Sequence, residues 1–316
     1  MRTVASLIVM AILTVALVGC ADPSRESEAE TLRDDLADLA GVTSVRLEYT
    51  VPVVLDSGKL ALEVEMNPDA ATDQVVAVVE KAYDAFRTTH HGEEADLSVT
   101  AGRTTVALRA FEPDATVAAV GAATSTGLSA VPMDGAVAID LTTQDVPQGD
   151  HVAGTYVVGL PGGSTADDVP TLLRSLAAEY DEEPVIGWGG SAADGSSLSY
   201  DLGFPPEALV ARWTRVQSAG LPLTVRAFED GSLFAEGHLP STYDVERRVD
   251  RRALDQITRP QLRALGDGEW LYDLVDVKGH YVVSIDRYLC EPTSESSYDD
   301  ALEAWVVEKL GSCTPP

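Results

Sequence analysis

The chain repeats itself at an offset of about 93 residues, and a duplication of this kind restricts it to folds built from similar units. Three blocks recur in the same order in two successive parts of the sequence. Residues 62–66 match 156–160, residues 75–86 match 169–180, and residues 111–115 match 204–208. Three ordered matches with nearly equal offsets indicate a duplication, so we expect two related α+β repeats, spanning residues 41–133 and 134–230.

Each repeat is predicted to alternate strands and helices. Apolar and polar residues alternate over residues 45–51, which predicts a strand with one buried face. The apolar residues of 75–86 recur at steps of three and four, which predicts an amphipathic helix. In the first repeat a Phe-x-Pro motif at Phe111 predicts the start of a second helix. We expect Gly127 to end that helix in a left-handed conformation, before a closing strand over 128–133.

Without its opening strand, each repeat has the order β-α-β-β-α-β, which resembles the ferredoxin-like family of folds. The resemblance implies an α+β fold class with tandem ferredoxin-like (split β-α-β) repeats, antiparallel sheets and helices on one face. Residues 231–316 are expected to form a partial third α+β unit. Its strands are expected at 231–236 and 280–283, matching the opening and second strands of the second repeat. We expect a helical insertion at about 243–265 and a last helix at about 297–310.

The first 20 residues have the pattern of an export signal. A single arginine precedes an apolar run over residues 4–18, which is shorter than the roughly 20 residues of a membrane-spanning helix. The run ends in Leu17-Val18-Gly19-Cys20, which resembles the lipobox of bacterial lipoproteins. The resemblance implies that the signal peptide 1–19 is removed and that Cys20 carries a lipid anchor. An ordinary signal peptide followed by an unrelated cysteine, and a membrane helix, are the alternatives.

This resemblance implies a lipid-anchored protein on the extracytoplasmic face of the cell membrane, with residues 20–40 as the lipidated cysteine and a polar tether. The chain has 51 acidic and 22 basic residues and a net charge of −29. Such a charge argues against a nucleic-acid partner, because nucleic-acid-binding surfaces are basic. It would also repel anionic headgroups, so we expect the membrane to be a partner only through acyl chains of the palmitate kind.

Two cysteines besides Cys20 are present, Cys290 and Cys313. In an oxidising compartment they are expected to form a disulfide. A loop of this length contributes roughly 3 kcal/mol in the chain-entropy model. Bridged Cα atoms lie within about 7 Å, so the chain before the last helix would have to run back along it.

One basic cluster occurs in this acidic chain. Arg247, Arg248, Arg251 and Arg252 would share about half of a helix surface, because residues four apart are neighbours on a helix. Guanidinium groups in this arrangement can bind phosphate, carboxylate or an acidic partner surface. They can equally pair with acidic residues of the same segment, such as Asp250, in which case the cluster is structural.

Two further segments contain residues of catalytic type. His90 and His91 precede three acidic residues, and imidazole with carboxylate can bind a divalent metal. Adjacent residues rarely point at one ion, however, and the segment is expected to be a solvated loop, so no metal site is predicted. The segment 187–191 lacks the spacing of a nucleophile elbow and is expected at a turn between strands. No P-loop, dinucleotide-binding or HExxH motif occurs, so no catalytic residue and no cofactor are predicted.

These observations favour a non-enzymatic lipoprotein of the cell envelope. Its tandem α+β modules would present a surface to an envelope protein, a glycan or a small ligand, or would serve as an accessory of a larger membrane complex. The alternative is an envelope hydrolase that uses carboxylates in a cleft between the repeats, because two suitably spaced carboxylates need no local motif. An enzyme is expected to have a polar pocket with clustered titratable groups.

Overall fold

The computed structural model describes residues 24–53, 56–132, 134–143, 152–180, 185–240, 251–287 and 297–310. In these residues it has seven α-helices and a mixed sheet of 12 strands, which follow the order of the chain from β1 to β12. The α+β class is therefore confirmed. The chain forms two compact units: unit 1 comprises residues 1–129 and 140–153, and unit 2 comprises 130–139 and 154–316. Within the described residues, no helix combines the length and the apolar character that crossing a membrane requires.

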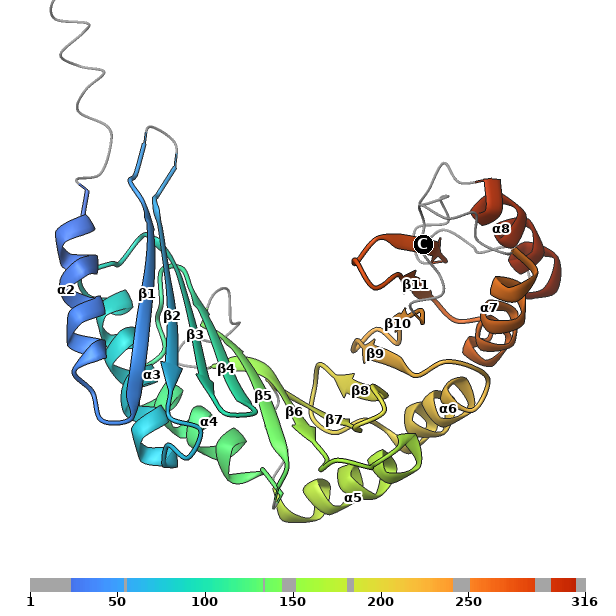
Figure 1. Ribbon diagram of the computed structural model, residues 1–316, viewed down its shortest axis with the longest axis horizontal. Coiled ribbons are helices and arrows are strands. Elements are labelled where there is room, and N and C mark those ends of the chain that lie inside the picture. Colours follow the sequence, from blue (N-terminus) through green and yellow to red (C-terminus); the bar gives the residue numbers. More distant parts are fainter. Residues whose placement is uncertain are drawn as a thin grey trace, which may run out of the picture. The chain divides into compact units, whose positions relative to one another are not determined.

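In unit 1, helices cover one face of a sheet and the other face is open (Figure 1). Its elements are α2 (Glu26–Ala37), β1 (Val42–Thr50), β2 (Lys59–Met66), α3 (Thr72–Arg87), β3 (Glu94–Ala101), β4 (Thr104–Ala110) and α4 (Val117–Ser129). In β3 the residues Ala95, Leu97 and Val99 are buried, whereas Asp96 and Ser98 between them are exposed. The alternation follows from the two-residue period of a strand with one face against the helices.

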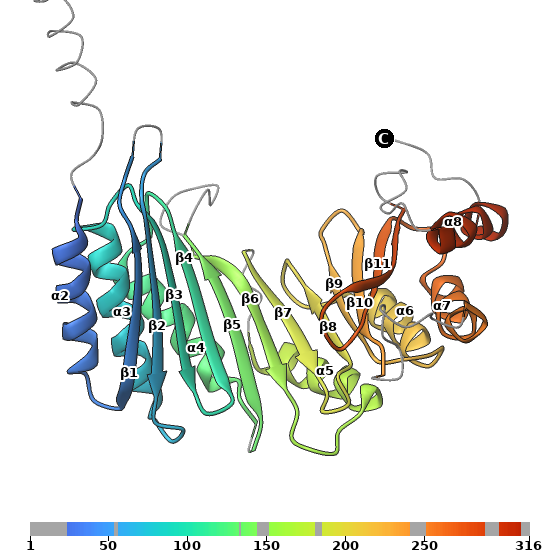
Figure 2. The same cartoon turned by 45° about the horizontal axis from the view of Figure 1, so that its top comes forward.

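The boundary between the two units lies within strand β5 (Ala136–Thr142). Unit 2 also has a helical layer on one face of its strands (Figure 2). Its elements are β6 (Ala153–Gly159), α5 (Val169–Glu179), β7 (Ile186–Ser191), β8 (Ser197–Tyr200), α6 (Glu207–Gln217), β9 (Leu223–Ala227), β10 (Leu233–His238), α7 (Arg251–Leu265), β11 (Trp270–Val275), β12 (Tyr281–Asp286) and α8 (Ser297–Leu310). Leucine, valine and tryptophan side chains from both layers form one buried core, which includes Leu198, Trp213, Leu262 and Trp270.

The pairing of the strands differs from the split β-α-β arrangement that the sequence predicts. Strands joined by a helix are parallel neighbours, as in β2 with β3, β6 with β7, β8 with β9, and β10 with β11. Strands joined by a short hairpin are antiparallel. In a split unit a third strand separates the two parallel strands, whereas here the two are hydrogen-bonded to each other. The prediction of antiparallel ferredoxin-like sheets was therefore wrong.

The order of the strands across the sheet explains this difference. A ferredoxin-like unit keeps its helices on one face because the chain turns back across the sheet between its two crossovers. In unit 2 the strand order never turns back, and α6 and α7 pack against each other on the same face. They connect strand pairs that run in opposite directions. Successive crossovers therefore have opposite hands, although nearly all β-α-β connections are right-handed.

Two boundaries in unit 1 also differ from the prediction. Residues 26–37, expected in the polar tether, form α2, because Ala29, Leu32 and Leu36 give the helix one apolar side that is buried. Gly127 does not end α4 in a left-handed conformation, but lies buried inside that helix, which continues to Ser129. The described residues 128–132 of the expected closing strand consequently form no strand, and β5 is the strand that follows α4.

The C-terminal part differs in the roles of its elements. Strand β10 begins a crossover instead of acting as an opening strand, and α7, within the expected helical insertion, is the crossover helix to β11. Residues 281–283 of the segment expected at 280–283 belong to β12, which is the hairpin partner of β11. The last helix, α8, has the expected bounds.

Candidate functional site

Most of the residues singled out from the sequence lie outside the described part of the chain. These are Cys20, Cys290, Cys313, Arg247 and Arg248.

Arg251 and Arg252 form the first turn of α7, and the side chain of Arg252 is exposed. The lipid anchor, the disulfide and the shared arginine surface therefore stay predictions.

His90 and Glu93 do not lie in a solvated loop, as the sequence analysis expected, but in a buried turn between α3 and β3. Their side chains are 0% and 4% exposed, and Nδ1 of His90 lies 2.7 Å from Oε2 of Glu93. His91, by contrast, is exposed. The spacing of three residues between a histidine and a glutamate is the sequence signal that could have indicated this contact.

The other oxygen of Glu93 is held by β1 and by the start of α2. The Tyr49 hydroxyl donates to Oε1 of Glu93 at 2.6 Å, and the backbone N–H of Arg25 donates to the Tyr49 oxygen at 2.9 Å. The Arg25 guanidinium also donates to the carbonyl oxygens of Thr89 and His91. Burial raises the pKa of the Tyr49 phenol, and its hydrogen bond to Glu93 raises it further. The start of α2 is thus fixed to the turn that carries His90.

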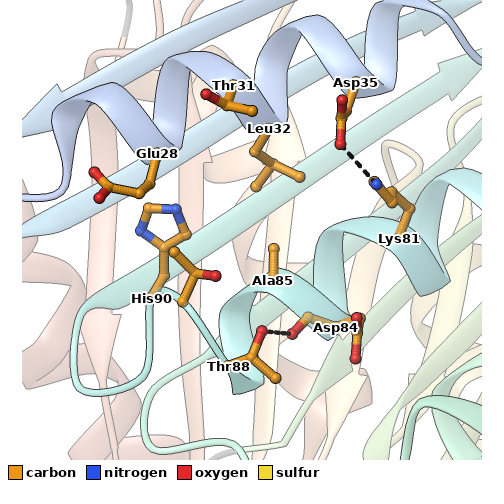
Figure 3. Close-up of a pocket in the computed structure, with 10 residues that line it drawn as sticks. Glu28, Thr31, Leu32, Asp35, Lys81, Asp84, Ala85, Thr88 and His90 are labelled. Atoms are coloured by element: carbon orange, nitrogen blue, oxygen red, sulfur yellow. Dashed lines mark hydrogen bonds and ion pairs between the residues drawn. The ribbon is translucent and has the colours of Figure 1, made fainter.

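A pocket of about 280 Å³ lies between α2 and α3, next to this turn. Its wall includes charged side chains from both helices and the ring of His90, which points up toward α2 beside Glu28 (Figure 3). Asp35 and Lys81 form an ion pair of 2.7 Å across the pocket. The pKa of Glu28 is lowered mainly by hydrogen bonds from Ser27 and from its own backbone.

The imidazole has one nitrogen without a hydrogen-bond partner. Nε2 of His90 is buried and makes no hydrogen bond to any described residue. Among the described residues no group of three or more His, Cys, Asp or Glu side chains is placed to hold a metal ion.

A second and larger cavity, of about 970 Å³, lies in unit 2 between α5 and α6. Each helix contributes residues at steps of three and four, which belong to one side of a helix. The lining residues are Pro170, Leu173, Arg174, Ala177 and Ala178 from α5, Glu207, Val210, Ala211, Thr214 and Arg215 from α6, and Phe204 and Pro205 before α6. The two stripes face each other, and most of their members are apolar or small.

Most of the groove-lining residues lie outside the buried core, although Leu173 belongs to the core and Val210 packs against it. Leu176, Trp213 and Val216 already bury a separate side of each helix against the sheet. Ala177 and Ala211 remain exposed on the groove side. The helical periodicity of the sequence predicts one apolar stripe per helix and does not reveal the second stripe. An alanine pair at 177–178 is too weak a signal to predict a groove.

Two guanidinium groups lie in this groove. In the described part of the chain neither Arg174 nor Arg215 forms an ion pair with a carboxylate, although Arg174 donates to the Thr171 hydroxyl at 3.2 Å. The pairing of β6 to β9 makes α5 and α6 antiparallel, so Arg215 in the last turn of α6 lies toward the first half of α5. Glu207, in the first turn of α6, belongs to the opposite end.

The glycine-rich segment 187–191 is a strand and not a turn. It forms β7, and its glycines let β8 approach closely. A Cβ on Gly187 would lie 2.1 Å from the carbonyl oxygen of Tyr200, and one on Gly189 would lie 2.7 Å from that of Leu198. These glycines therefore have a packing role.

No protein-family model, no curated protein and no solved structure matches this chain significantly.

Proposed function

We propose that this protein is a membrane-anchored extracytoplasmic lipoprotein that acts as a non-enzymatic binding module. The observation that carries the binding role is the groove between α5 and α6, which we propose receives an amphipathic helix of an envelope partner protein. The lipobox at Cys20 supports the anchor.

The shape of the groove supports a helix as the occupant. Its two walls are antiparallel helices that each offer apolar positions over about two turns. A third helix that lies in such a groove is held by anchors at positions i, i+3, i+4 and i+7. The small side chains of Ala177, Ala178 and Ala211 leave room for the large apolar anchors of a partner helix.

The basic residues of the groove indicate that the partner helix carries an acidic residue. Arg174 and Arg215 lie toward the same end of the groove in a chain whose net charge is −29. Such a chain has few places where it attracts an anion, and a carboxylate can bind a guanidinium group through two hydrogen bonds. The partner helix is therefore expected to carry Asp or Glu at the end near these arginines.

Mass spectrometry of the mature protein from its native membrane tests the anchor. We expect an N-terminal Cys20 with a diacylglycerol mass, and release of a Cys20→Ser variant from the membrane fraction. A free thiol at Cys20, or an intact signal peptide, would refute the lipoprotein proposal without affecting the groove.

Site-specific photo-crosslinking tests the groove in the membrane-bound protein. A photoreactive residue at Ala211 points into the groove, and one at Ala208 of the same helix is a matched control that is exposed outside it. We expect a specific crosslink from position 211 alone, which the groove-filling variant Ala177→Trp abolishes. The crosslinked peptide should be a helix with an apolar stripe and acidic residues.

Three outcomes would contradict the proposal. Equal crosslinking from positions 208 and 211 would mean that the groove has no special role. A crosslink to lipid would mean that the groove binds an acyl chain and not a helix of a partner protein. A crosslinked peptide without helical periodicity would exclude the proposed type of occupant.

A second candidate is a hydrolase with paired carboxylates, and the register of β10 and β11 favours it. Glu236 and Asp273 are direct neighbours in this parallel pair, and the His238 ring lies 3.6 Å from Glu236. Asp273 is only 3% exposed, which limits access to substrate. Turnover of a chromogenic glycoside that an Asp273→Asn variant loses would favour the enzyme over the binding module.

We also propose that the chain arose by internal duplication. The order of β2, α3, β3, β4, α4 and β5 recurs in β6, α5, β7, β8, α6 and β9, which supports the sequence matches. The Phe-x-Pro motif precedes the second helix in both, at Phe111 and at Phe204.

A further inference from the structure

The pocket between α2 and α3 contains a buried imidazole nitrogen that no side chain satisfies. The His90 side chain is 0% exposed, and its Nε2 lies in the part of the ring that points up to α2 (Figure 3). A buried polar atom in a native structure normally has a partner. The missing partner of Nε2 is therefore informative.

The partners of Glu93 determine which nitrogen of His90 carries the proton. The Tyr49 hydroxyl donates to Oε1, and Nδ1 of His90 faces Oε2 at 2.7 Å. Oε1 already accepts from Tyr49, which leaves Oε2 as the acceptor for the N–H at Nδ1 of His90. Nε2 then presents a lone pair, which needs a donor or a metal ion.

Three donors of the pocket are already engaged with other groups. Lys81 pairs with Asp35, the Thr88 hydroxyl donates to the carbonyl of Asp84, and the Thr31 hydroxyl donates to that of Ser27. What lies beside the imidazole ring is the Glu28 carboxylate (Figure 3). A group that satisfies both Nε2 and this carboxylate is a cation.

We propose that Nε2 of His90 and the carboxylate of Glu28 bind a divalent transition-metal ion of the Zn²⁺ type. A histidine whose other nitrogen donates to a carboxylate is the usual arrangement of a metal-binding imidazole. The remaining acidic side chains, Asp35 and Asp84, outnumber the one lysine of the pocket and favour a cation further. Imidazole selects transition metals over Mg²⁺ and Ca²⁺.

The two ligands come from different elements. Glu28 lies in the first turn of α2, and His90 follows α3. Two protein ligands leave the other coordination positions to water, so the ion exchanges readily. Its binding would join α2 to the rest of unit 1 and slow the opening of this helix. The proposal is independent of the groove in unit 2 and of the lipid anchor.

Isothermal titration of the full mature chain with Zn²⁺, in an excess of Mg²⁺, tests the site. We expect one Zn²⁺ per chain. The Glu28→Gln variant should bind about tenfold or more weakly, and His90→Gln should lose the site. Matched controls are Glu30→Gln, on the same helix, and His91→Gln, next in the chain; both residues are exposed and outside the pocket lining, and neither change should matter.

A second measurement does not depend on the affinity alone. Hydrogen exchange of the α2 amides should slow when Zn²⁺ is added to the wild type, and should not respond in Glu28→Gln. Because Glu28 is exposed, this variant is expected to fold even if His90→Gln does not. Unchanged Zn²⁺ binding in Glu28→Gln, loss of binding in the two controls, or the absence of 1:1 binding would overturn the proposal.

Discussion

Nδ1 of His90 lies 2.7 Å from Oε2 of Glu93, and both side chains are buried beneath the first helix of unit 1. The same carboxylate accepts from Tyr49, whose oxygen accepts from the backbone of Arg25. One buried carboxylate thereby connects α2, β1 and the turn after α3. These polar contacts fix the start of α2 to unit 1, together with the buried Ala29, and they can be removed one at a time.

Removing the hydroxyl of Tyr49 should destabilise unit 1. In Tyr49→Phe, Oε1 of Glu93 loses its donor and the Arg25 N–H loses its acceptor, which costs about 1 to 2 kcal/mol. Urea unfolding measures this change. Tyr281→Phe is the control, because Tyr281 is 64% exposed. Equal stability of the two variants would show that the network contributes nothing.

The local structure could largely be predicted from the sequence. The amphipathic stripe at 75–86 predicts α3, and the last helix has the bounds expected for it. The topology could not be predicted in the same way, because periodicity identifies an element but not its neighbour in the sheet. Nearly all β-α-β crossovers are right-handed, and with helices on one face this rule favours a split unit. In this chain successive crossovers instead alternate in hand.

The candidate sites could be predicted only in part. A histidine three residues before a glutamate was visible, but its burial depends on α2, which the polar composition of residues 26–37 concealed. Burial of Ala29, Leu32 and Leu36 needs only one narrow side of that helix. The groove depends on the spacing between α5 and α6, which is a tertiary property without a local sequence signal.

The strand glycines of β7 should not tolerate a side chain. In Gly187→Ala the new Cβ would lie 2.1 Å from the backbone oxygen of Tyr200, so β8 must move away and lose pairing. We expect a loss of at least about 2 kcal/mol in the free energy of unfolding. Gly162→Ala is the matched control, because nothing lies within 4 Å of its Cβ position. Similar unfolding midpoints for both variants would contradict the close approach.

Alkaline pH should destabilise the protein through Tyr83. Burial raises the pKa of this phenol, whose hydroxyl donates to the carbonyl of Ala115. The folded state then keeps Tyr83 neutral, whereas the unfolded chain ionises it near pH 10. The resulting stability is complete below that pH and is lost as the pH rises toward the raised pKa of the folded state.

The measurement is the urea midpoint from about pH 8 to 11, with tyrosinate absorbance as a second signal. Tyr83→Phe should lower stability at neutral pH and flatten the alkaline decline, whereas Tyr281→Phe should leave the decline unchanged. A decline of the same steepness in Tyr83→Phe would assign it to other groups.

Reversing the charge of the groove should weaken the proposed partner helix without affecting the fold. Arg174 and Arg215 are exposed, so Arg174→Glu with Arg215→Glu is expected to change stability little. An acidic helix would then meet two carboxylates, and we expect its affinity to fall about tenfold or more at low salt.

The measurement is titration with the peptide identified by crosslinking, at two salt concentrations. Arg46→Glu in unit 1, also an exposed arginine, is the control. Added salt should weaken binding to the wild type and narrow its difference from the double variant, because screening reduces attraction and repulsion alike. Equal affinities of the double variant and the wild type at low salt would leave only apolar contacts to hold the helix, and the acidic character proposed for the partner would be wrong.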